Sequence, residues 1–445
     1  MIKRFELKPP QLPSYTWAAG SYLDLFAASA VMQVLFGFTL YWILFVNPEL
    51  TEENLWMPAL GLLSAMGWMM AIVLGIGFDI TPLNFGAAPF DNTLISMVTA
   101  LNLSGQILII IGVLIGDIVW FEKLGLMGVT LLAISLCLIG PLAVQFVRIR
   151  SKSKQKIGPW YYGPGLAMPV IGVIGLLGWL FWTNELISEL FWLVIIDTFW
   201  SMMAFAIIIA HFQSRLGWKL MTRKQLTSAF VIFLILCFIH VSLVLGLELG
   251  YVTDQRVKAT FAAPLLWVFW VSRPDRIWRN VLDNKPHSTQ MLSAHLWLVP
   301  VTCVGFIEGY YHLNSGMFYA RFMLLLGVSA QAIWAAADYL HDDHKFKAIE
   351  DRKQAWVSVI CMNFAMAGTI YLFIDYAKPE AELTQVGDIM LVTVILLIIA
   401  FCDVVFWLIR ETLWNHGDWQ RIPLFYGTRH ADTDDPYAEI EDPLE

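Results

Sequence analysis

The chain has 445 residues, of which 58% are hydrophobic and 14% are charged, and its net charge is −8. Soluble globular proteins carry about 25% charged residues, so the composition excludes a soluble protein and predicts an all-α integral membrane protein. No basic tract indicates nucleic-acid binding, and five cysteines that lie singly in apolar runs argue against disulfides and thiolate metal sites.

The chain divides into a membrane domain between two polar ends. We expect residues 1–21 to be a cytoplasmic N-terminal arm, 22–410 the membrane domain and 411–445 an acidic cytoplasmic C-terminal tail. A spanning helix needs about 20 mostly apolar residues. The sequence predicts twelve transmembrane helices, at about 22–46, 56–77, 94–116, 124–147, 166–183, 190–211, 228–247, 259–272, 294–313, 317–339, 355–377 and 388–410. The short eighth segment leaves open an earlier start or a partly re-entrant path.

The basic residues predict the orientation. With the N-terminus inside, cytoplasmic segments hold 23 of the 28 Lys and Arg residues, outer loops hold four, and Arg321 lies within a span. Cytoplasmic loops of membrane proteins carry the excess of basic residues. We therefore expect both termini to be cytoplasmic, and the protein to lie in the cell's inner (cytoplasmic) membrane.

A helical hairpin at residues 293–327 holds polar residues inside apolar sequence. Two apolar runs meet at the turn 314–316, with Glu308 before it and Arg321 after it. The two residues are roughly equidistant from the turn, so they are expected to lie at similar depth and to form an ion pair. A charge left alone at that depth costs about 2.5–3.5 kcal/mol.

Further polar residues share the outer half of the predicted membrane domain. Asp197, His240 and His312 join Glu308 there, on three different spans. Ionisable residues inside a membrane are candidates for function. The four can converge in one cavity, and two imidazoles at one depth are the minimum for a bis-His haem. Alternatively, each finds a local serine, carbonyl or ion-pair partner.

The sixth span has an aromatic-rich pattern around Asp197 and Trp200. It resembles the sixth helix of the haem-copper oxidase superfamily, particularly the nitric oxide reductase branch. That helix begins with a metal-binding histidine, for which this chain has Leu193 or Ile196. The predicted number of spans and the chain length are similar to the catalytic subunits of that superfamily. The resemblance implies a haem-copper-oxidase-like fold without the usual binuclear centre, and no metal ligand carries over.

Two functions are consistent with these patterns. The first is a membrane subunit of a respiratory or other redox complex, with an electron-transfer or structural role. It would contact the lipid bilayer, other membrane subunits and a quinone, and hold a haem b through His240, His312 or both. The alternative is a secondary transporter with a polar path through spans six, seven, nine and ten. In either case Asp197, Glu308 and Arg321 form a buried polar cluster.

Overall fold

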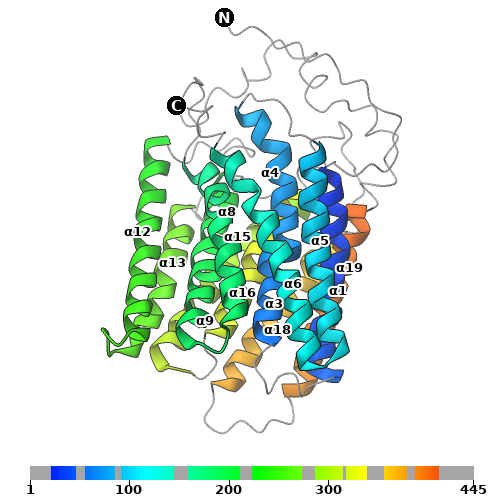
Figure 1. Cartoon of the computed structure of the whole chain (residues 1–445). Coiled ribbons are helices and arrows are strands. Elements are labelled where there is room, and N and C mark those ends of the chain that lie inside the picture. Colours follow the sequence, from blue (N-terminus) through cyan, green and yellow to red (C-terminus); the bar gives the residue numbers. More distant parts are fainter. Residues whose placement is uncertain are drawn as a thin grey trace, which may run out of the picture.

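The computed structural model is a bundle of helices (Figure 1). It describes residues 22–46, 56–85, 92–144, 159–210, 223–272, 286–313, 317–337, 355–377 and 386–409. No strand occurs among these residues, and eleven of their helical segments are long and apolar enough to cross a membrane. The chain is therefore an all-α, multi-pass membrane protein, as the composition predicted. The N-terminal arm, the C-terminal tail and the turn 314–316 lie outside the described residues.

The helices include several π-helical stretches, in which each turn holds an extra residue. The α-helices are α1 (Tyr22–Tyr41), α3 (Trp56–Leu62), α4 (Met69–Phe85), α5 (Asn92–Ile115), α6 (Ile118–Cys137), α8 (Pro159–Leu180), α9 (Glu185–Phe191), α10 (Ser201–Phe205), α12 (Arg223–Glu248), α13 (Ala262–Val271), α15 (Pro286–Tyr311), α16 (Phe318–Met323), α18 (Ala355–Tyr376) and α19 (Val386–Ile409). The π-helical stretches are η1 (Trp42–Val46), η2 (Leu63–Trp68), η3 (Trp192–Trp200), η4 (Ala206–Ala210) and η6 (Leu324–Ala330), whereas η5 (Gln255–Phe261) is a 3₁₀ helix.

Several helices begin earlier than the sequence predicted, and the two largest differences occur at prolines. Helix α8 starts at Pro159 instead of residue 166, and α15 starts at Pro286 instead of residue 294. Proline is favoured at the first position of a helix, where its missing N–H is not needed. The apolar runs therefore mark the membrane-embedded parts of these helices, and not their full lengths.

The predicted eighth span is the one segment that is too short to count as a spanning helix by itself. The 3₁₀ helix η5 leads directly into α13, and the two pack between α12 and α15. At about 2.0 Å per 3₁₀ residue and 1.5 Å per α-helical residue, the continuous stretch is roughly 29 Å long. That length is close to the thickness of the hydrocarbon core.

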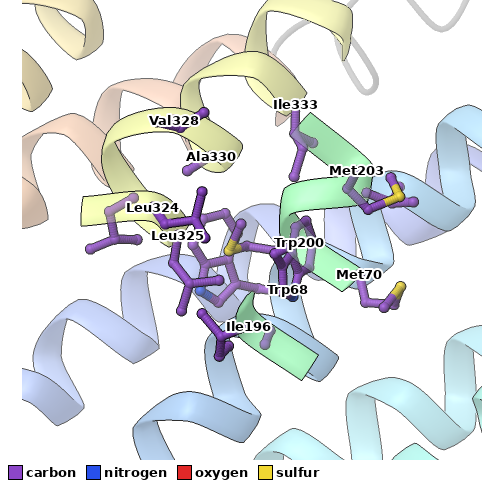
Figure 2. Packing of buried hydrophobic residues seen from close by; sticks show 14 of the residues in the cluster. Trp68, Met70, Ile196, Trp200, Met203, Leu324, Leu325, Val328, Ala330 and Ile333 are labelled. Atoms are coloured by element: carbon purple, nitrogen blue, oxygen red, sulfur yellow. The ribbon is translucent and has the colours of Figure 1, made fainter. Parts of the chain in front are cut away.

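Three spans form the centre of the bundle. We call them the Trp68 span (Pro58–Phe78), the Asp197 span (Glu185–Ile209) and the Arg321 span (Phe318–Ala337). In the most apolar stretch of each central span, between 72% and 94% of the residues are buried inside the protein. In each of the other eight spans the buried share is 50% or less. Figure 2 shows side chains of all three meeting around Trp68 and Trp200. These central spans are shielded from lipid by the other helices.

Each central span contains a π-helical stretch near its middle: η2, η3 and η6 respectively. In η2, Gly67 leaves helical geometry altogether, with φ −89° and ψ −109°. Neighbouring side chains bond to the carbonyls around this break, since Asn102 donates to Met66 O at 3.2 Å and Ser29 donates to Trp68 O at 2.8 Å. The Trp68 span is therefore a broken helix held in place by α1 and α5.

Candidate functional site

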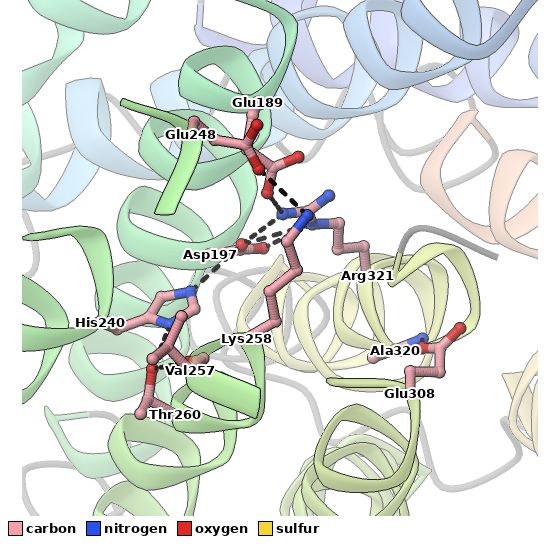
Figure 3. Close-up of polar contacts among 10 residues, drawn as sticks. All are labelled: Glu189, Asp197, His240, Glu248, Val257, Lys258, Thr260, Glu308, Ala320 and Arg321. Atoms are coloured by element: carbon pink, nitrogen blue, oxygen red, sulfur yellow. Dashed lines mark hydrogen bonds and ion pairs between the residues drawn. The ribbon is translucent and has the colours of Figure 1, made fainter. Parts of the chain in front are cut away.

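A buried ion pair joins two central spans (Figure 3). Arg321 donates from Nε to Asp197 Oδ1 at 3.0 Å and from Nη2 to Asp197 Oδ2 at 2.8 Å. The side chains are only 6% and 1% exposed. Two roughly parallel N–H···O bonds between a guanidinium and a carboxylate are charge-assisted and fix both groups in orientation. The pair therefore ties the Asp197 span to the Arg321 span.

Glu189 extends this pair toward one end of the bundle. Its Oε1 accepts a hydrogen bond from Arg321 Nη2 at 2.9 Å, and its side chain is 16% exposed. Glu189 precedes Asp197 by eight residues, so it lies about two turns nearer the connection at residues 181–184. That end, the lower end in Figure 1, also carries the connection 249–254, and we call it the cluster end. The charges thus run from the core toward the surface.

His240 on α12 contacts the other side of Asp197 (Figure 3). Its Nε2 lies 3.4 Å from Asp197 Oδ2, and its Nδ1 lies 2.8 Å from Thr260 Oγ1. Thr260 Oγ1 also lies 2.6 Å from the carbonyl oxygen of Val257. We call Glu189, Asp197, His240 and Arg321 the ionic cluster.

These contacts determine where the protons of His240 lie. The carbonyl of Val257 can only accept, so the single hydroxyl proton of Thr260 is donated to it. The oxygen of Thr260 then accepts from His240 Nδ1–H. An ionised carboxylate also only accepts, so His240 Nε2 needs a proton to bond to Asp197. The arrangement favours a doubly protonated, positively charged His240.

In this state the ionic cluster is neutral. Arg321 and His240 supply two positive charges, and Asp197 and Glu189 supply two negative ones. Buried charges are tolerated when each is compensated and hydrogen-bonded, and removing one leaves an uncompensated charge at a cost of several kcal/mol. With a neutral His240 in place of the imidazolium, the same four side chains would carry a net charge of −1.

Glu308 supports the cluster through the backbone. Its carboxylate accepts from the N–H groups of Tyr319 and Ala320, at 3.2 and 2.8 Å, in the first turn of α16. These N–H groups have no partner within a helix, and a carboxylate also interacts favourably with the positive end of the helix dipole. Glu308 thus caps the helix that carries Arg321.

A close approach of backbones positions Thr260. A Cβ at Gly309 on α15 would lie only 2.3 Å from the backbone nitrogen of Ala259, and one at Gly305 would meet the ring of Phe261. The two glycines therefore let η5 lie directly against α15. This packing holds Thr260 within reach of His240.

The structure brings together only some of the residues that the sequence singled out. Asp197, His240 and Arg321 are in direct contact, and Glu308 caps the helix of Arg321. The guanidinium of Arg321 bonds to Asp197 and Glu189, and the predicted Glu308–Arg321 ion pair stays a prediction. His312 is exposed after the end of α15, with φ 54°.

The site does not fit the predicted haem. Iron binds an imidazole nitrogen that is free of other partners. Both ring nitrogens of His240 have hydrogen-bonding partners, and His312 is exposed while His240 is buried. Across the described ranges, no group of three or more His, Cys, Asp or Glu residues is arranged to hold a metal ion. The resemblance to haem-copper oxidases therefore gains no support from these side chains.

A small cavity adjoins the ionic cluster. It has a volume of about 70 Å³ and is lined by Phe36, Leu40, Leu60, Gly61, Ser64, Trp192, Phe318, Arg321, Phe322, Leu325 and Leu326. A water molecule needs a cavity of about 10–15 Å³. The cavity therefore has room for a few waters or a small polar group beside Arg321.

Sequence reasoning missed two residues of this region, and a third buried polar residue nearer the other end of the bundle. Glu189 could have been found, because a carboxylate eight residues before Asp197 shares its helix face. Thr260 gave no signal, since its role depends on the approach of η5 to α15. His295 was also missed: it is fully buried on α15, bonds through Nε2 to Ser272 Oγ at 2.8 Å, and stacks on Phe269.

No protein-family model matches the sequence, and a search of curated proteins finds no match either.

Proposed function

We propose that the protein is a proton-coupled secondary transporter, with the ionic cluster as its proton-binding site. The observation that carries the proposal is the hydrogen bonding of His240, which favours an imidazolium that balances a buried group of charges. Ionisable residues buried inside membrane proteins commonly mark ion pathways and proton relays.

The coupling follows from the charge balance. When His240 releases a proton, the ionic cluster carries one uncompensated negative charge in a poorly solvated place, which is costly. The cost falls if Arg321, Asp197 and Glu189 rearrange or if the site becomes hydrated. Protonation of His240 therefore favours one arrangement of the central spans, and its loss favours another.

The backbone of the central spans supports such a movement. Transporters commonly place their sites where helices are broken near the middle of the membrane. Here the Trp68 span breaks at Gly67. The π-helical stretch η3 carries Asp197, and η6 begins three residues after Arg321. Because π-helical turns can shift or close, these spans can change without unfolding.

Access to the proton site is proposed from the cluster end. Exposure falls from Glu189 at 16% to Arg321 at 6% and Asp197 at 1%, so the charges lead inward from the surface. The small cavity borders Arg321 as well. A proton or a small solute thus has a graded route to the ionic cluster.

The proposal includes an orientation. We propose twelve crossings of the cell's inner membrane with both termini cytoplasmic, which puts the cluster end outside. The distribution of 23 basic residues against four supports it. Single cysteines at positions 51 and 153, outside the described residues, test this orientation. A membrane-impermeant thiol reagent added from outside should label Thr51→Cys and leave Ser153→Cys unreacted. The reverse pattern means that the topology is inverted.

Proton movement in inverted membrane vesicles tests the transport function. A respiration-driven pH gradient, followed with a quenched acridine dye, is challenged with Na⁺, K⁺, amino acids, sugars and carboxylates in turn. At least one solute should dissipate the gradient in wild-type vesicles but not in His240→Gln or Asp197→Asn vesicles. Lys258→Gln is the matched control, because Lys258 forms a partly exposed ion pair with Glu248 at the same end. Identical responses in all four vesicle types contradict the proposal.

An optical spectrum of the purified protein tests the redox function that the family resemblance implies. Ordinary haem b proteins show a strong Soret band, and a transporter of this design needs none. A stoichiometric Soret band that is lost in His240→Gln would overturn the assignment of His240 as a proton site and restore the redox subunit.

A further inference from the structure

Several hydroxyl side chains in the peripheral spans bond to their own helix. Thr99, Thr130 and Thr393 each donate to the carbonyl four residues earlier, and Ser135 donates to the carbonyl three residues earlier, all at 2.7 to 2.8 Å. This back-bonding is the usual way for Ser and Thr to satisfy a hydroxyl within an apolar helix.

Hydroxyls in two central spans behave differently. The Oγ atoms of Thr198 and Ser201 in the Asp197 span, and of Ser329 in the Arg321 span, are buried and bond to no atom of the described chain. The indole N–H of Trp200 and the Oε1 of Gln331 share this property. Five of the ten buried side-chain atoms without a partner in the described chain therefore lie on the two spans that carry Asp197 and Arg321.

These atoms follow one another inward from the ionic cluster. Asp197 and Arg321 are bonded and so lie at one depth, and α10 and η6 are in contact. Counted along the spans, Ser201 lies four residues farther from the cluster end than Asp197, and Ser329 and Gln331 lie eight and ten residues farther from it than Arg321. Residues four or eight apart lie on similar faces of a helix, so Ser201 follows Asp197 inward and Ser329 follows Arg321.

The aromatic centre of the bundle adds two more unsatisfied groups at the inner part of this series. They are the indole N–H of Trp68 and the amide Nε2 of Gln33, whose Oε1 accepts from Trp334 at 3.2 Å. Figure 2 shows Trp68 beside Trp200, where the three central spans meet. Donors and acceptors thus both occur along the series.

We infer that the central spans bind a file of water molecules from the ionic cluster to the level of Gln331 and Gln33. An isolated hydroxyl left unsatisfied in a protein interior is costly, and such groups in native proteins commonly bind ordered water. Water that bonds to two or three of these groups satisfies them together. The back-bonded hydroxyls of the peripheral spans need no such partner.

The file gives the proton of His240 a route toward the inner side, and this step rests on the proposed transport function. Hydrogen-bonded water passes a proton by exchanging O–H bonds, so no heavy atom crosses the core. Each water accepts one proton and donates another, and the balance of atoms and charge is kept. The side chains only hold the water in line.

Cysteine accessibility tests the water file independently of transport. In a variant with the five native cysteines replaced by alanine, Ser201→Cys and Ser329→Cys are compared with Ser135→Cys, in membranes treated with a small methanethiosulfonate amine. Ser135 is as deeply buried, but its hydroxyl is satisfied. The thiolate is the reactive form and requires water, so positions 201 and 329 should react at least about tenfold faster than 135.

The outcomes separate the two proposals. Equal, slow reaction at all three positions overturns the water file, even if proton coupling is observed. Fast reaction at 201 and 329 without proton coupling in the vesicle assay keeps the water file and removes the transport function. A high-resolution map of the wild-type protein covers the case in which a cysteine variant does not fold. It should show water at hydrogen-bonding distance from Ser201 and Ser329, and density for protein atoms alone there contradicts the inference.

Discussion

The α5–α6 hairpin and the central spans solve the problem of packing helices in a membrane in opposite ways. Gly105 and Gly128 face each other across the hairpin so closely that a Cβ on either would lie 2.5–2.7 Å from the other's carbonyl oxygen. The two-residue turn uses Gly116 at φ 70° and Asp117, which caps α6 by accepting from Val119 and Trp120. Small residues and local hydrogen bonds suffice there.

The central spans instead contain buried charges, π-helical turns and polar atoms without protein partners. None of these features is needed to pack helices, as the hairpin demonstrates. Polar groups inside a membrane are expensive and persist where they serve a function. The comparison therefore indicates that the hairpin contributes to stability alone, whereas we propose that the polar groups of the centre also serve the activity, and the following changes test that division.

Arg321→Met should have the largest effect, because it leaves the buried Asp197 with His240 alone and removes the cation that Glu189 bonds to. Breaking a buried ion pair from one side costs about 3–5 kcal/mol. Thermal unfolding and folded yield in detergent measure the loss. The triple variant, which combines Arg321→Met with Asp197→Asn and Glu189→Gln, should recover part of the stability. If the losses of the three single variants add up in the triple variant, the ion pair does not contribute to stability.

Gly128→Ala should lower the free energy of unfolding by about 2 kcal/mol, because the new methyl group forces α5 and α6 apart. Gly77→Ala is the matched control, since nothing lies within 4 Å of a Cβ there, and it should be neutral or slightly stabilising. Proton coupling per folded molecule should be unchanged in both. A loss of coupling in folded Gly128→Ala protein would contradict the division between hairpin and centre.

Thr260→Val should cost about 1.5 kcal/mol, because His240 Nδ1 loses its acceptor while staying buried. Unlike the hairpin change, it should also alter proton coupling, since the position of the second proton on His240 depends on Thr260. Thr260→Ser keeps the hydroxyl and should behave as wild type in both unfolding and vesicle assays. Equal behaviour of the valine and serine variants is the result that opposes this role.

Glu308→Gln should have the smallest effect, about 1 kcal/mol. The amide oxygen can still accept from Ala320, but the charge that favours the start of α16 is lost. Unfolding should shift modestly while coupling through Arg321 persists. A loss as large as that of Arg321→Met would indicate that Glu308 pairs with Arg321, as the sequence predicted.

The sequence predicted the helical class and most spans because apolar length alone determines them. It also predicted that Arg321 needs a carboxylate. It proposed the nearest one in the hairpin, Glu308, and that pair stays a prediction. The structure also supplies Asp197, 124 residues earlier, which the sequence did not pair with Arg321. Contacts between distant spans follow from packing in three dimensions, which periodicity along one helix does not encode.

The π-helical turns could not have been predicted from the sequence. A π turn differs from an α turn by one residue in its hydrogen bonding, and the same residues fit either. What selects it is the packing of neighbours, as where Asn102 bonds to the carbonyl of Met66 beside the break at Gly67. Thr260 is a similar case, since its contact with His240 depends on Gly309 in another helix.

The neutrality of the ionic cluster has an electrical consequence. With His240 protonated, the cluster has no net charge, so the membrane potential exerts no net force on it as a whole. Without that proton, the cluster bears one negative charge, and a full crossing of the field by one charge is worth about 2.3 kcal/mol per 100 mV. If the ionic cluster is the proton-binding site of a transporter, as we propose, its two states respond differently to voltage, and an inside-negative potential favours movement of the proton of His240 toward the cytoplasm.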